Sequence, residues 1–503
     1  MGMLDIFRRK PKPVAKKRGF DGAATGRLFS DFVTSQRSAD SELRYSLKTL
    51  RNRCRELARN NEYARRYLHL VKTNVVGERG ASLQVKATNV DGSLDTIGNT
   101  IIEQEWKRWS KVGSCTVDGR LSFADAQAMV VESMARDGEA LVRIVNYDGN
   151  QDRFALEFLE PDLIDEEKNE RAPNGNEIRM GVEFDQYRRP VAYHMMTEHP
   201  GDYQFHQYDR RTQRVEAENI LHLYMPDRAQ QTRGVPWMST ALTSLKMLHG
   251  YREAELVAAR TAASKMGFFV SRSGEGFMGD DLEDNVVPIT DAEPGSFFQL
   301  PRDVEFQPWD PSHPTSAFGD FEKSILRGIA SGLGVSYHSL ANDLTQTSYS
   351  SIRQGSIEDR DFYKMIQSYM ITHFVMPIYE KWLINAFTIG SVNLPIDKFD
   401  KFASASQFRP RGFAWVDPQR EINAHVVALQ NGLISLQDVA NVYGRDVEEV
   451  FAQVARDKQL ADQFGLKLAF EPFGGGQSPY GPGKINILTG ESFDEMTEDA
   501  DGD

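Results

Sequence analysis

Residues 228–237 read RAQQTRGVPW and residues 332–353 read GLGVSYHSLANDLTQTSYSSIR, and the chain between them decides the fold. The proline-free segment 238–265 predicts a helix on the order of 40 Å long. Residues 267–314 are rich in Gly, Pro and Asp, with strand-like runs at 267–270 and 296–300, and a second helix is predicted over 316–331. The order is therefore helix, β-rich excursion, helix and polar loop.

Further helices flank this segment on its C-terminal side. A helix is predicted over 351–387, and Pro377 should kink it. Short helices broken at Gly432 and Gly444 follow up to Phe470. Pro236 has a fixed φ that suits the first turn of the long helix, so we expect that helix to open there.

The N-terminal side mixes helices and strands. Two helices divided at Asn60-Asn61 are predicted over 41–76, a third over 97–109, and a fourth begins after the capping residue Ser122. Residues 139–223 alternate strand-like runs with turn signals. This is an α+β pattern without βαβ alternation, so it disfavours a doubly wound nucleotide-binding domain.

Composition bounds the class of protein. The 503 residues are 40% apolar and 26% charged, which is typical of a folded soluble protein with room for a sizeable core. No apolar run approaches a bilayer span, and no apolar region follows the basic start, so we expect neither a membrane segment nor a secretory signal. Two cysteines, Cys54 and Cys115, favour a reducing compartment over a disulfide framework.

Charge leaves the question of nucleic acid open. The net charge is −13, which is unlike a high-affinity duplex binder, yet it also suits a conduit along which DNA slides without being gripped. The basic arm over 1–20 either contacts DNA or a capsid-scaffold partner or only solubilises the chain. The Gly/Pro-rich acidic end over 472–503 is predicted to be a flexible tail.

Three enzyme-like patterns are weak. The Gly-rich run around Lys484 lacks phosphate-loop spacing, because Ile485 follows the lysine. The acidic run over 157–167 could suggest two-metal or glycosidase chemistry, but an exposed acidic loop is favoured. Histidines 194, 199 and 206 lack zinc spacing and are interpreted as satisfied or surface residues. We therefore expect no catalytic residue, no metal and no cofactor.

The ordered segments, with the motif Trp415-Val416-Asp417-Pro418 and Glu421, resemble the portal proteins of tailed bacteriophages, in the branch that includes phage lambda. The resemblance covers roughly Leu43 to Leu466. It implies an α+β portal fold with an α/β wing, a two-helix stem, a small β-rich clip, a long kinked helix and an α-helical C-terminal crown. It divides the chain into a basic arm (1–20), wing (21–236), stem helix 1 (237–266), clip (267–314), stem helix 2 (315–333), channel or tunnel loop (334–350), long kinked helix and wing return (351–410), helical crown (411–471) and acidic tail (472–503).

The resemblance also implies a ring of twelve subunits. Twelve helices about 10 Å wide need a circle of axes about 38 Å across, which leaves a bore of roughly 28 Å. Duplex DNA, about 20 Å wide, would pass through such a bore. A ring of this kind needs head-to-tail contacts between different patches of neighbouring subunits.

The candidate site is the tunnel loop, whose polar side chains could touch phosphates transiently without strong affinity. The predicted DNA-channel residues are Thr345, Gln346, Thr347, Ser348 and Tyr349. Cations on the two stem helices could also face the bore, although long helices carry such residues on solvated faces anyway. These cations are Lys246, Arg252, Arg260, Lys323 and Arg327.

The predicted function is a structural channel at one capsid vertex for packaging and ejecting double-stranded DNA. The resemblance implies several partners and no membrane. They are further copies of the chain in the twelve-membered ring, double-stranded DNA bound non-specifically and transiently, the terminase large subunit, major capsid and scaffold proteins, and head-completion or tail adaptors. The expected location is the portal vertex of the virion, and the host cytoplasm during assembly. Two alternatives stay open: a metal-dependent DNA-processing enzyme that uses the acidic run, and a portal-associated capsid adaptor without a pore.

Overall fold

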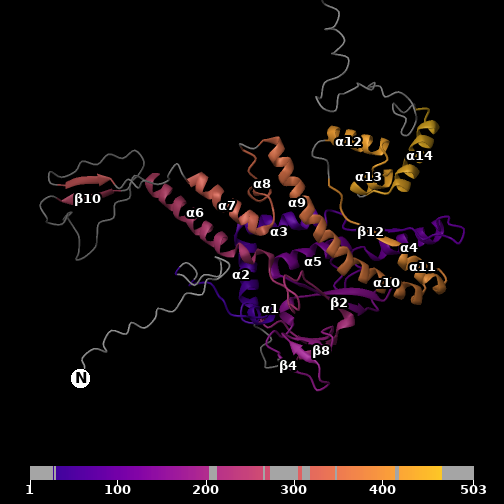
Figure 1. Ribbon diagram of the computed structural model, residues 1–503, viewed down its shortest axis with the longest axis horizontal. Helices are drawn as coiled ribbons and strands as arrows, with labels where there is room; N and C mark the ends of the chain where they lie inside the picture. Colours follow the sequence, from indigo (N-terminus) through magenta and orange to yellow (C-terminus); the bar gives the residue numbers. More distant parts are fainter. Residues whose placement is uncertain are drawn as a thin grey trace, which may run out of the picture.

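The protein has a mixed α-helical and β-sheet body from which a pair of helices projects (Figure 1). The computed structural model describes residues 27, 30–202, 212–263, 267–271, 304–308, 318–345, 348–413, 418–443 and 445–466. The basic arm, the acidic tail and His206 lie outside these residues. The α+β class predicted from the sequence is confirmed.

The first helices are α1 (Ala39–Leu43), α2 (Leu47–Asn60) and α3 (Glu62–Val75). Asn61 separates α2 from α3 as predicted. Its side chain accepts hydrogen bonds from the amides of Tyr63, at 3.1 Å, and Ala64, at 3.0 Å, which satisfies two of the free N–H groups at the start of α3.

Helices α4 (Thr96–Trp109) and α5 (Phe123–Asp137) also lie where the sequence predicts them. Ser122 caps α5 in a reciprocal pair with Asp125, and Gly138 ends it with φ of 90°, in the left-handed region that favours glycine. These two helices supply much of the aromatic core. The Trp106 ring meets Phe123, Trp382 and Phe408 edge-on, with centroids 5.1, 5.1 and 5.6 Å away.

All strand pairs in the described residues are antiparallel, so the absence of a doubly wound sheet predicted from the sequence holds for this part of the chain. One sheet has the order β3-β2-β9, and a second is a meander from β4 to β8. The strands are β2 (Ala140–Asn146), β3 (Phe154–Leu159), β9 (Ile220–Leu223), β4 (Glu170–Arg171), β5 (Glu177–Arg179), β6 (Val182–Phe184), β7 (Pro190–Met196) and β8 (Thr212–Glu216). The 3₁₀ turns Pro161–Leu163 and Ala217–Asn219 connect them.

A third, two-stranded sheet pairs β1 (Ser82–Val85), which follows α3, with β12 (Ser406–Arg409), which lies near the end of the body. The pairing therefore places the two ends of the body side by side.

Glu183 of the meander holds a charge inside the sheet. Its carboxylate accepts hydrogen bonds from Arg214 Nε at 2.8 Å and Asn176 Nδ2 at 2.7 Å, and lies 3.2 Å from His194 Nε2. Hydrogen bonding by Arg214, aided by Asn174, Asn176 and His194 and opposed by burial, lowers the pKa of Glu183 to about 2. The folded state therefore favours the charged carboxylate, and His194 is the satisfied buried histidine that the sequence predicts.

We expect Glu183→Gln to remove part of the acid sensitivity of the protein. A lowered carboxyl pKa stabilises the folded state fully above the ordinary value of about 4.3, and this contribution is lost as pH falls toward 2. Urea unfolding at pH 6 and pH 3 measures the loss, expected to be smaller in the variant by about 1–2 kcal/mol. Glu170→Gln, at an exposed site of β4, is the control. An identical pH dependence in wild type and Glu183→Gln would contradict the assignment.

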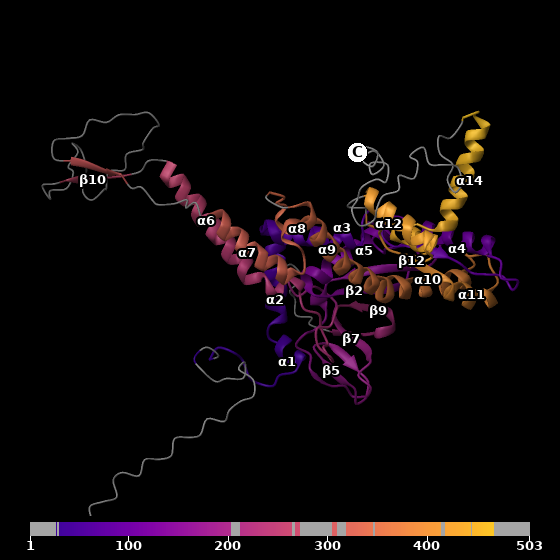
Figure 2. The same ribbon diagram turned by 45° about the horizontal axis from the view of Figure 1, so that its top comes forward.

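The projecting pair consists of α6 (Leu242–Ala263) and α7 (Phe318–Leu333), which lie side by side in both views (Figures 1 and 2). Strands β10 (Gly267–Ser271) and β11 (Val304–Pro308) pair beyond their far ends. The strand predicted over 296–300 lies outside the described residues. We call α6 and α7 the helix pair.

Pro236 does not open α6, so that prediction is wrong. Its ψ is 129°, which is extended, and a 3₁₀ turn over Trp237–Thr240 precedes the first residue of α6. The physical reason is the close approach of Gly138 to the backbone of Val235 and Pro236, which holds this segment extended against the start of β2.

The segment expected to be a loop over 334–350 contains a short helix, α8 (Tyr337–Ala341), which is a second correction. Ser336 caps it, and Asp359 accepts hydrogen bonds from Ser336 N at 2.7 Å and Ser339 Oγ at 2.6 Å. These polar caps stabilise a helix that is too short for hydrophobic periodicity to reveal.

The long helix is formed by α9 (Tyr349–Met370) and α10 (Met376–Ile389), with a π turn over Ile371–Val375 between them. The interruption falls just before Pro377, which lacks an N–H and cannot continue the regular ladder. The chain then passes through the 3₁₀ turn Ile396–Lys398, α11 (Phe399–Ser404) and β12 to α12 (Pro418–Gln430), α13 (Leu436–Val442) and α14 (Val447–Gln463). Gly432 separates α12 from α13, as predicted, and Gly444 lies outside the described residues.

Candidate functional site

A buried cluster of charges joins the body to the base of the helix pair. Arg233, in the segment before the 3₁₀ turn, directs Nη2 to Glu139 Oε1 at 2.5 Å and Nε to Glu139 Oε2 at 3.0 Å. Arg51 of α2 directs Nη2 to Glu139 Oε1 at 2.7 Å from the other side. All three side chains are inaccessible to solvent, so each charge depends on the others for its partner.

The rest of the cluster surrounds this centre. Arg51 also contacts Glu166 at 2.7 Å and Asp162 at 3.3 Å, and Arg55 contacts Asp137 at 2.7 Å. We call this set the buried charge cluster; its members are Arg51, Arg55, Arg136, Asp137, Glu139, Asp162, Glu166 and Arg233.

The charges fix the protonation states at the centre of the cluster. Burial alone would raise the pKa of Glu139, but Arg233, the hydrogen bond from His222 and Arg51 hold it well below its usual value. Burial lowers the pKa of His222, so the neutral ring donates from Nε2 to Glu139 Oε2 at 2.8 Å. Glu139 is therefore a charged acceptor shared by two guanidinium groups and one imidazole.

The acidic run over 157–167 is not the exposed loop expected from the sequence, which is a correction. Asp162 and Glu166 belong to the buried charge cluster, and Glu157 lies 3.5 Å from Arg143 on the neighbouring strand. The run is partly buried because arginines distant in the sequence neutralise it. Only Glu160 and Glu167 of its six carboxylates are exposed.

One group in the described residues has ligand atoms close enough for a metal ion: Glu160, Asp162 and His199, all within 4.8 Å of one another. The guanidinium groups of Arg51 and Arg55 already contact these carboxylates. Arg51 Nη1 lies 3.3 Å from Asp162 Oδ1. Arg55 Nη2 lies 2.6 Å from Asp162 Oδ2 and 3.7 Å from Glu160 Oε2. A cation in this position repels a second one, so the donor set does not favour a metal.

The predicted channel loop is held by Asp343 where it leaves α8. The Asp343 carboxylate accepts hydrogen bonds from Tyr337 at 2.8 Å and from the amide of Thr345 at 2.9 Å. Hydrogen bonding, chiefly from Thr345, keeps the pKa of Asp343 well below its usual range. The first half of the loop is thus fixed to α8 by a charged acceptor.

The predicted channel residues differ in their surroundings. Thr345 is exposed and bound to Asp343, whereas Ser348 caps α9 by accepting from Ser351 N at 3.2 Å. Gln346, Thr347 and the side chain of Tyr349 lie outside the described residues. Thr345 therefore lies beside Asp343, just after α8, and Ser348 lies at the start of α9; their place in a channel stays a prediction.

Several of the predicted stem cations have partners within the same subunit. Lys246 lies 3.6 Å from Glu56, and Lys323 lies 3.8 Å from Asp343. Arg252 lies between Glu62, at 3.4 Å, and Glu322, at 3.3 Å.

The other two predicted stem cations are Arg327 and Arg260. Arg327 lies over the ring of Tyr337, 5.5 Å from its centroid. Arg260 is exposed near the end of α6.

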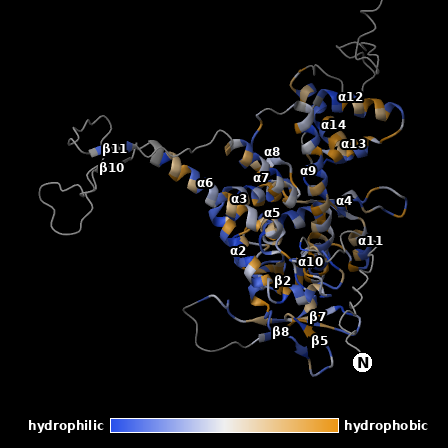
Figure 3. Cartoon of the chain, turned by 60° about the vertical axis from the view of Figure 1, so that its left-hand side comes forward, coloured by the Kyte–Doolittle hydropathy of each residue, from blue (hydrophilic) through white to orange (hydrophobic). Residues whose placement is uncertain are grey.

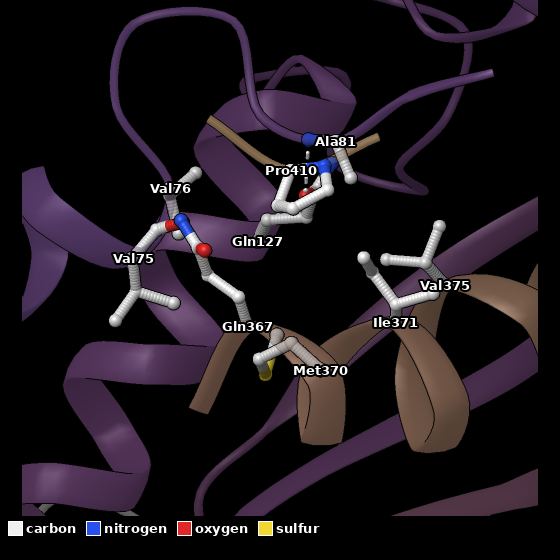
Figure 4. Close-up of a pocket in the computed structure, with 9 residues that line it drawn as sticks. All are labelled: Val75, Val76, Ala81, Gln127, Gln367, Met370, Ile371, Val375 and Pro410. Atoms are coloured by element: carbon white, nitrogen blue, oxygen red, sulfur yellow. Dashed lines mark hydrogen bonds between the residues drawn. The ribbon is translucent and has the colours of Figure 1, made fainter. Parts of the chain in front are cut away.

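A small pocket lies beside the π turn of the long helix (Figure 4). Met370, Ile371 and Val375 line one side, and the Gln367 amide donates to Val75 O at 3.1 Å on the other. Its volume of about 10 Å³ suits at most one water molecule and is far below that of a ligand site.

Sequence reasoning missed the buried charge cluster, although one signal was present. Arg51 falls on the apolar face of α2, four residues after Leu47 and three before Cys54, both of which are buried. A cation at such a position requires a buried anion. The anion could not be identified, because Glu139 is far away in the sequence.

The architecture defines a class of protein. An α+β body carries two projecting helices with a β ribbon beyond them, and a long interrupted helix returns through the body. The arrangement matches the α+β portal fold expected from the sequence.

The chain belongs to the lambda family of phage portal proteins. The family profile described as "Phage portal protein, lambda family" matches residues 25–367. A "Probable portal protein" of Halomonas phage phiHAP-1 is 34% identical over 489 residues, which cover 96% of this chain and 92% of the relative. "Portal protein B" of Escherichia phage lambda is 22% identical over 89% of this chain and 90% of its own length.

Solved structures with a related arrangement come from gene transfer agent particles. A chain from the neck of an empty particle has a TM-score of 0.42 at 13% identity and covers 84% of this chain and 99% of its own length. A chain from the virion of a native particle has a TM-score of 0.40 at 13% identity, over 82% and 95% respectively.

Membership in the family determines the general role. The protein is a structural, non-enzymatic component of the phage virion that forms the head–tail connector, and neither alternative function is supported. Within the described part of the chain, no helix combines the length and apolar character needed to cross a bilayer.

Proposed function

We propose that twelve copies of the chain form a ring around a channel through which double-stranded DNA enters the capsid and later leaves it. Membership in the portal family supports a ring at the capsid vertex. The observation that carries the channel is the helix pair, which projects from the body (Figure 2) and has many exposed side chains among the residues that the structure describes.

In the proposed ring, each segment of the chain forms one part of the portal. The body over 21–236, with the return over 351–410, is the wing; α6 and α7 are the stem; and 267–314 is the clip. Residues 411–471 form the crown facing the capsid interior, and 334–350 form the tunnel loop. The clip docks the terminase large subunit during packaging and the head-completion or tail adaptors afterwards, and capsid and scaffold proteins receive the ring in the host cytoplasm.

Charge supports a channel that holds DNA weakly. The net charge is −13, and Lys246, Arg252 and Lys323 have carboxylate partners in their own subunit, which reduces their attraction for phosphates. Thr345 and Ser348 offer hydroxyl groups near the loop without adding charge. DNA contact is then non-specific and transient.

Replacing the loop tests this role. The variant Gln346→Gly, Thr347→Gly and Tyr349→Ser keeps Ser348, because Ser348 caps α9. We expect rings to form normally while the number of DNA-filled particles falls several-fold, because the loop keeps only Thr345 and Ser348 of its five predicted contact residues. Native mass measurement counts subunits, and nuclease-protected DNA per particle measures packaging.

The control replaces two exposed wing residues, Val90→Ser and Tyr187→Ser, and should package normally. Unchanged DNA content in the loop variant would reject the loop as the contact site. A chain that never forms a ring, alone or with its capsid proteins, would reject the channel itself.

A further inference from the structure

The last three helices lie together at one end of the molecule in all three views (Figures 1, 2 and 3). We call α12, α13 and α14 the C-terminal helices. They share little hydrophobic core with the body, because Asp446 and Ala461 are the only buried residues in the described part of 419–466. Apolar burial therefore fixes their position only weakly, and polar contacts carry more of that task.

The carboxylate of Asp446 joins the C-terminal helices to the body. Asp446 is 2% exposed and directly precedes α14. Its Oδ1 caps that helix by accepting from the amides of Glu448, at 2.8 Å, and Glu449, at 3.4 Å. Its Oδ2 contacts Lys86 Nζ at 2.8 Å and accepts from Arg409 Nη2. One carboxylate therefore connects α14 with strand β12 and with the residue that follows β1.

The surroundings of Asp446 favour its charged form. Burial alone would raise the pKa of Asp446, but hydrogen bonds from Lys86, Gln84, the amide of Glu448 and Arg409 hold it well below its usual range. The side chains of Lys86 and Arg409 are only 28% and 13% exposed, so water reaches the two cations poorly. The contact is therefore a largely buried ion-pair network, whose strength depends on the charge of Asp446.

A second carboxylate, on the body, interacts with the same group. Glu103 of α4 accepts a hydrogen bond from Val85 N at 2.8 Å. Burial, opposed by that hydrogen bond and aided by the negative charges of Glu449 and Asp446, raises the pKa of Glu103. The C-terminal helices thus bring acidic groups toward an acidic group of the body, and the two cations must outweigh this repulsion.

We infer that Asp446 is a latch: its negative charge keeps the C-terminal helices docked on the body, and loss of that charge releases them together while the body stays folded. Removing one partner from a buried ion pair leaves the others uncompensated, so the docked position loses its stabilisation. The body keeps its own core, in which Trp106 packs against Trp382 and Phe408. The latch acts within one copy of the chain, so the inference goes beyond the proposed ring and does not rest on it.

Distances between spin labels test the latch in the full-length chain. The labels are attached, two at a time, to Ile97→Cys of α4, Val427→Cys of α12 and Leu460→Cys of α14, where the native residues are 74%, 45% and 57% exposed. The native Cys54 and Cys115 are buried, so they stay unlabelled. Labelled chain is diluted into unlabelled chain, so that any ring carries one labelled copy.

Asp446→Asn should release the helices without removing the cap of α14, because asparagine caps a helix as well as aspartate does but carries no charge. The distances from position 97 to positions 427 and 460 should broaden by about twofold or more, whereas the distance between positions 427 and 460 should stay narrow. The urea midpoint, followed by tryptophan fluorescence, should stay within error of the value without the substitution, since the body keeps its core.

Two further variants separate the latch from the cap. Asp438→Asn is the matched control, because Asp438 takes part in the cap of α13, where it accepts from Ser435 N at 2.9 Å. It should leave all three distances unchanged. Arg409→Gln removes a cation on the body side and leaves the cap of α14 intact. It should broaden the same two distances as Asp446→Asn, and it decides the question if Asp446→Asn does not fold.

Four results would overturn the inference. Narrow distances from position 97 in both Asp446→Asn and Arg409→Gln would show that the ion pairs do not hold the helices. Broadening between positions 427 and 460 as well would mean that the helices melt instead of detaching. A lower urea midpoint would mean that the body itself loses stability. Broad distances from position 97 before any latch residue is changed would show that there is no docked position to hold.

Discussion

Replacing Glu139 with alanine is expected to lower the free energy of unfolding by about 3–5 kcal/mol, because it leaves buried charges without a partner. Arg51 and Arg233 both direct guanidinium groups to this carboxylate, and their side chains are inaccessible to solvent. The amide of Gly234 also loses its acceptor, which lies 3.1 Å away. Urea unfolding of the unassembled chain, followed by tryptophan fluorescence, measures the change.

A matched control is Glu160→Ala, in the same acidic run. Glu160 is 61% exposed and lies 3.7 Å from Arg55, so its removal should cost less than about 1 kcal/mol. Equal effects of the two substitutions would show that the buried charge cluster contributes no more than a surface ion pair. A large effect of Glu139→Ala alone would establish that the base of the helix pair depends on it.

Gly138→Ala is expected to destabilise the protein by more than about 4 kcal/mol, to the extent that little soluble chain is recovered. The added Cβ would lie 2.5 Å from the carbonyl carbon of Val235 and 2.6 Å from the nitrogen of Pro236. These are backbone atoms that cannot rotate away, so the segment that carries Arg233 would have to move. Soluble yield and the urea midpoint of the recovered protein measure the effect.

Gly175→Ala separates this clash from backbone strain. Gly175 has φ of 86°, close to the 90° of Gly138, but a Cβ there would meet nothing within 4 Å. Its substitution should therefore cost only the left-handed conformation, about 1–2 kcal/mol. If both alanine variants lost the same stability, close packing between Gly138 and residues 234–236 would not be the cause.

The sequence predicts the helices and their caps well, because those signals are local. Asn61 and Ser122 each satisfy backbone amides within three residues, so their roles can be inferred from the adjacent sequence. The short helix α8 was missed, because the Asp359 carboxylate that holds its cap lies on another helix.

The candidate site was less predictable for the same reason. The acidic run and Arg51 are both visible in the sequence, but only the fold shows that they neutralise each other. Pairing of Lys246 with Glu56 and of Lys323 with Asp343 likewise depends on which helices lie together. The role of Thr345 and Ser348 in a channel remains a prediction, because it depends on contacts between subunits.

The pairing of β1 with β12 has a consequence for biosynthesis. Ser82 pairs with Arg409 and Val85 with Ser406, so this two-stranded sheet forms only after the ribosome has made nearly all of the body. Contacts of such high sequence separation form slowly, since a long loop must close first. Strand β1 of the nascent chain therefore stays unpaired until residues 406–409 have been made. By then the helix pair, which lies between β1 and β12 in the sequence, has already been synthesised. Chaperones would meet an open intermediate, and a chain released before residue 406 would lack the strand that closes its body.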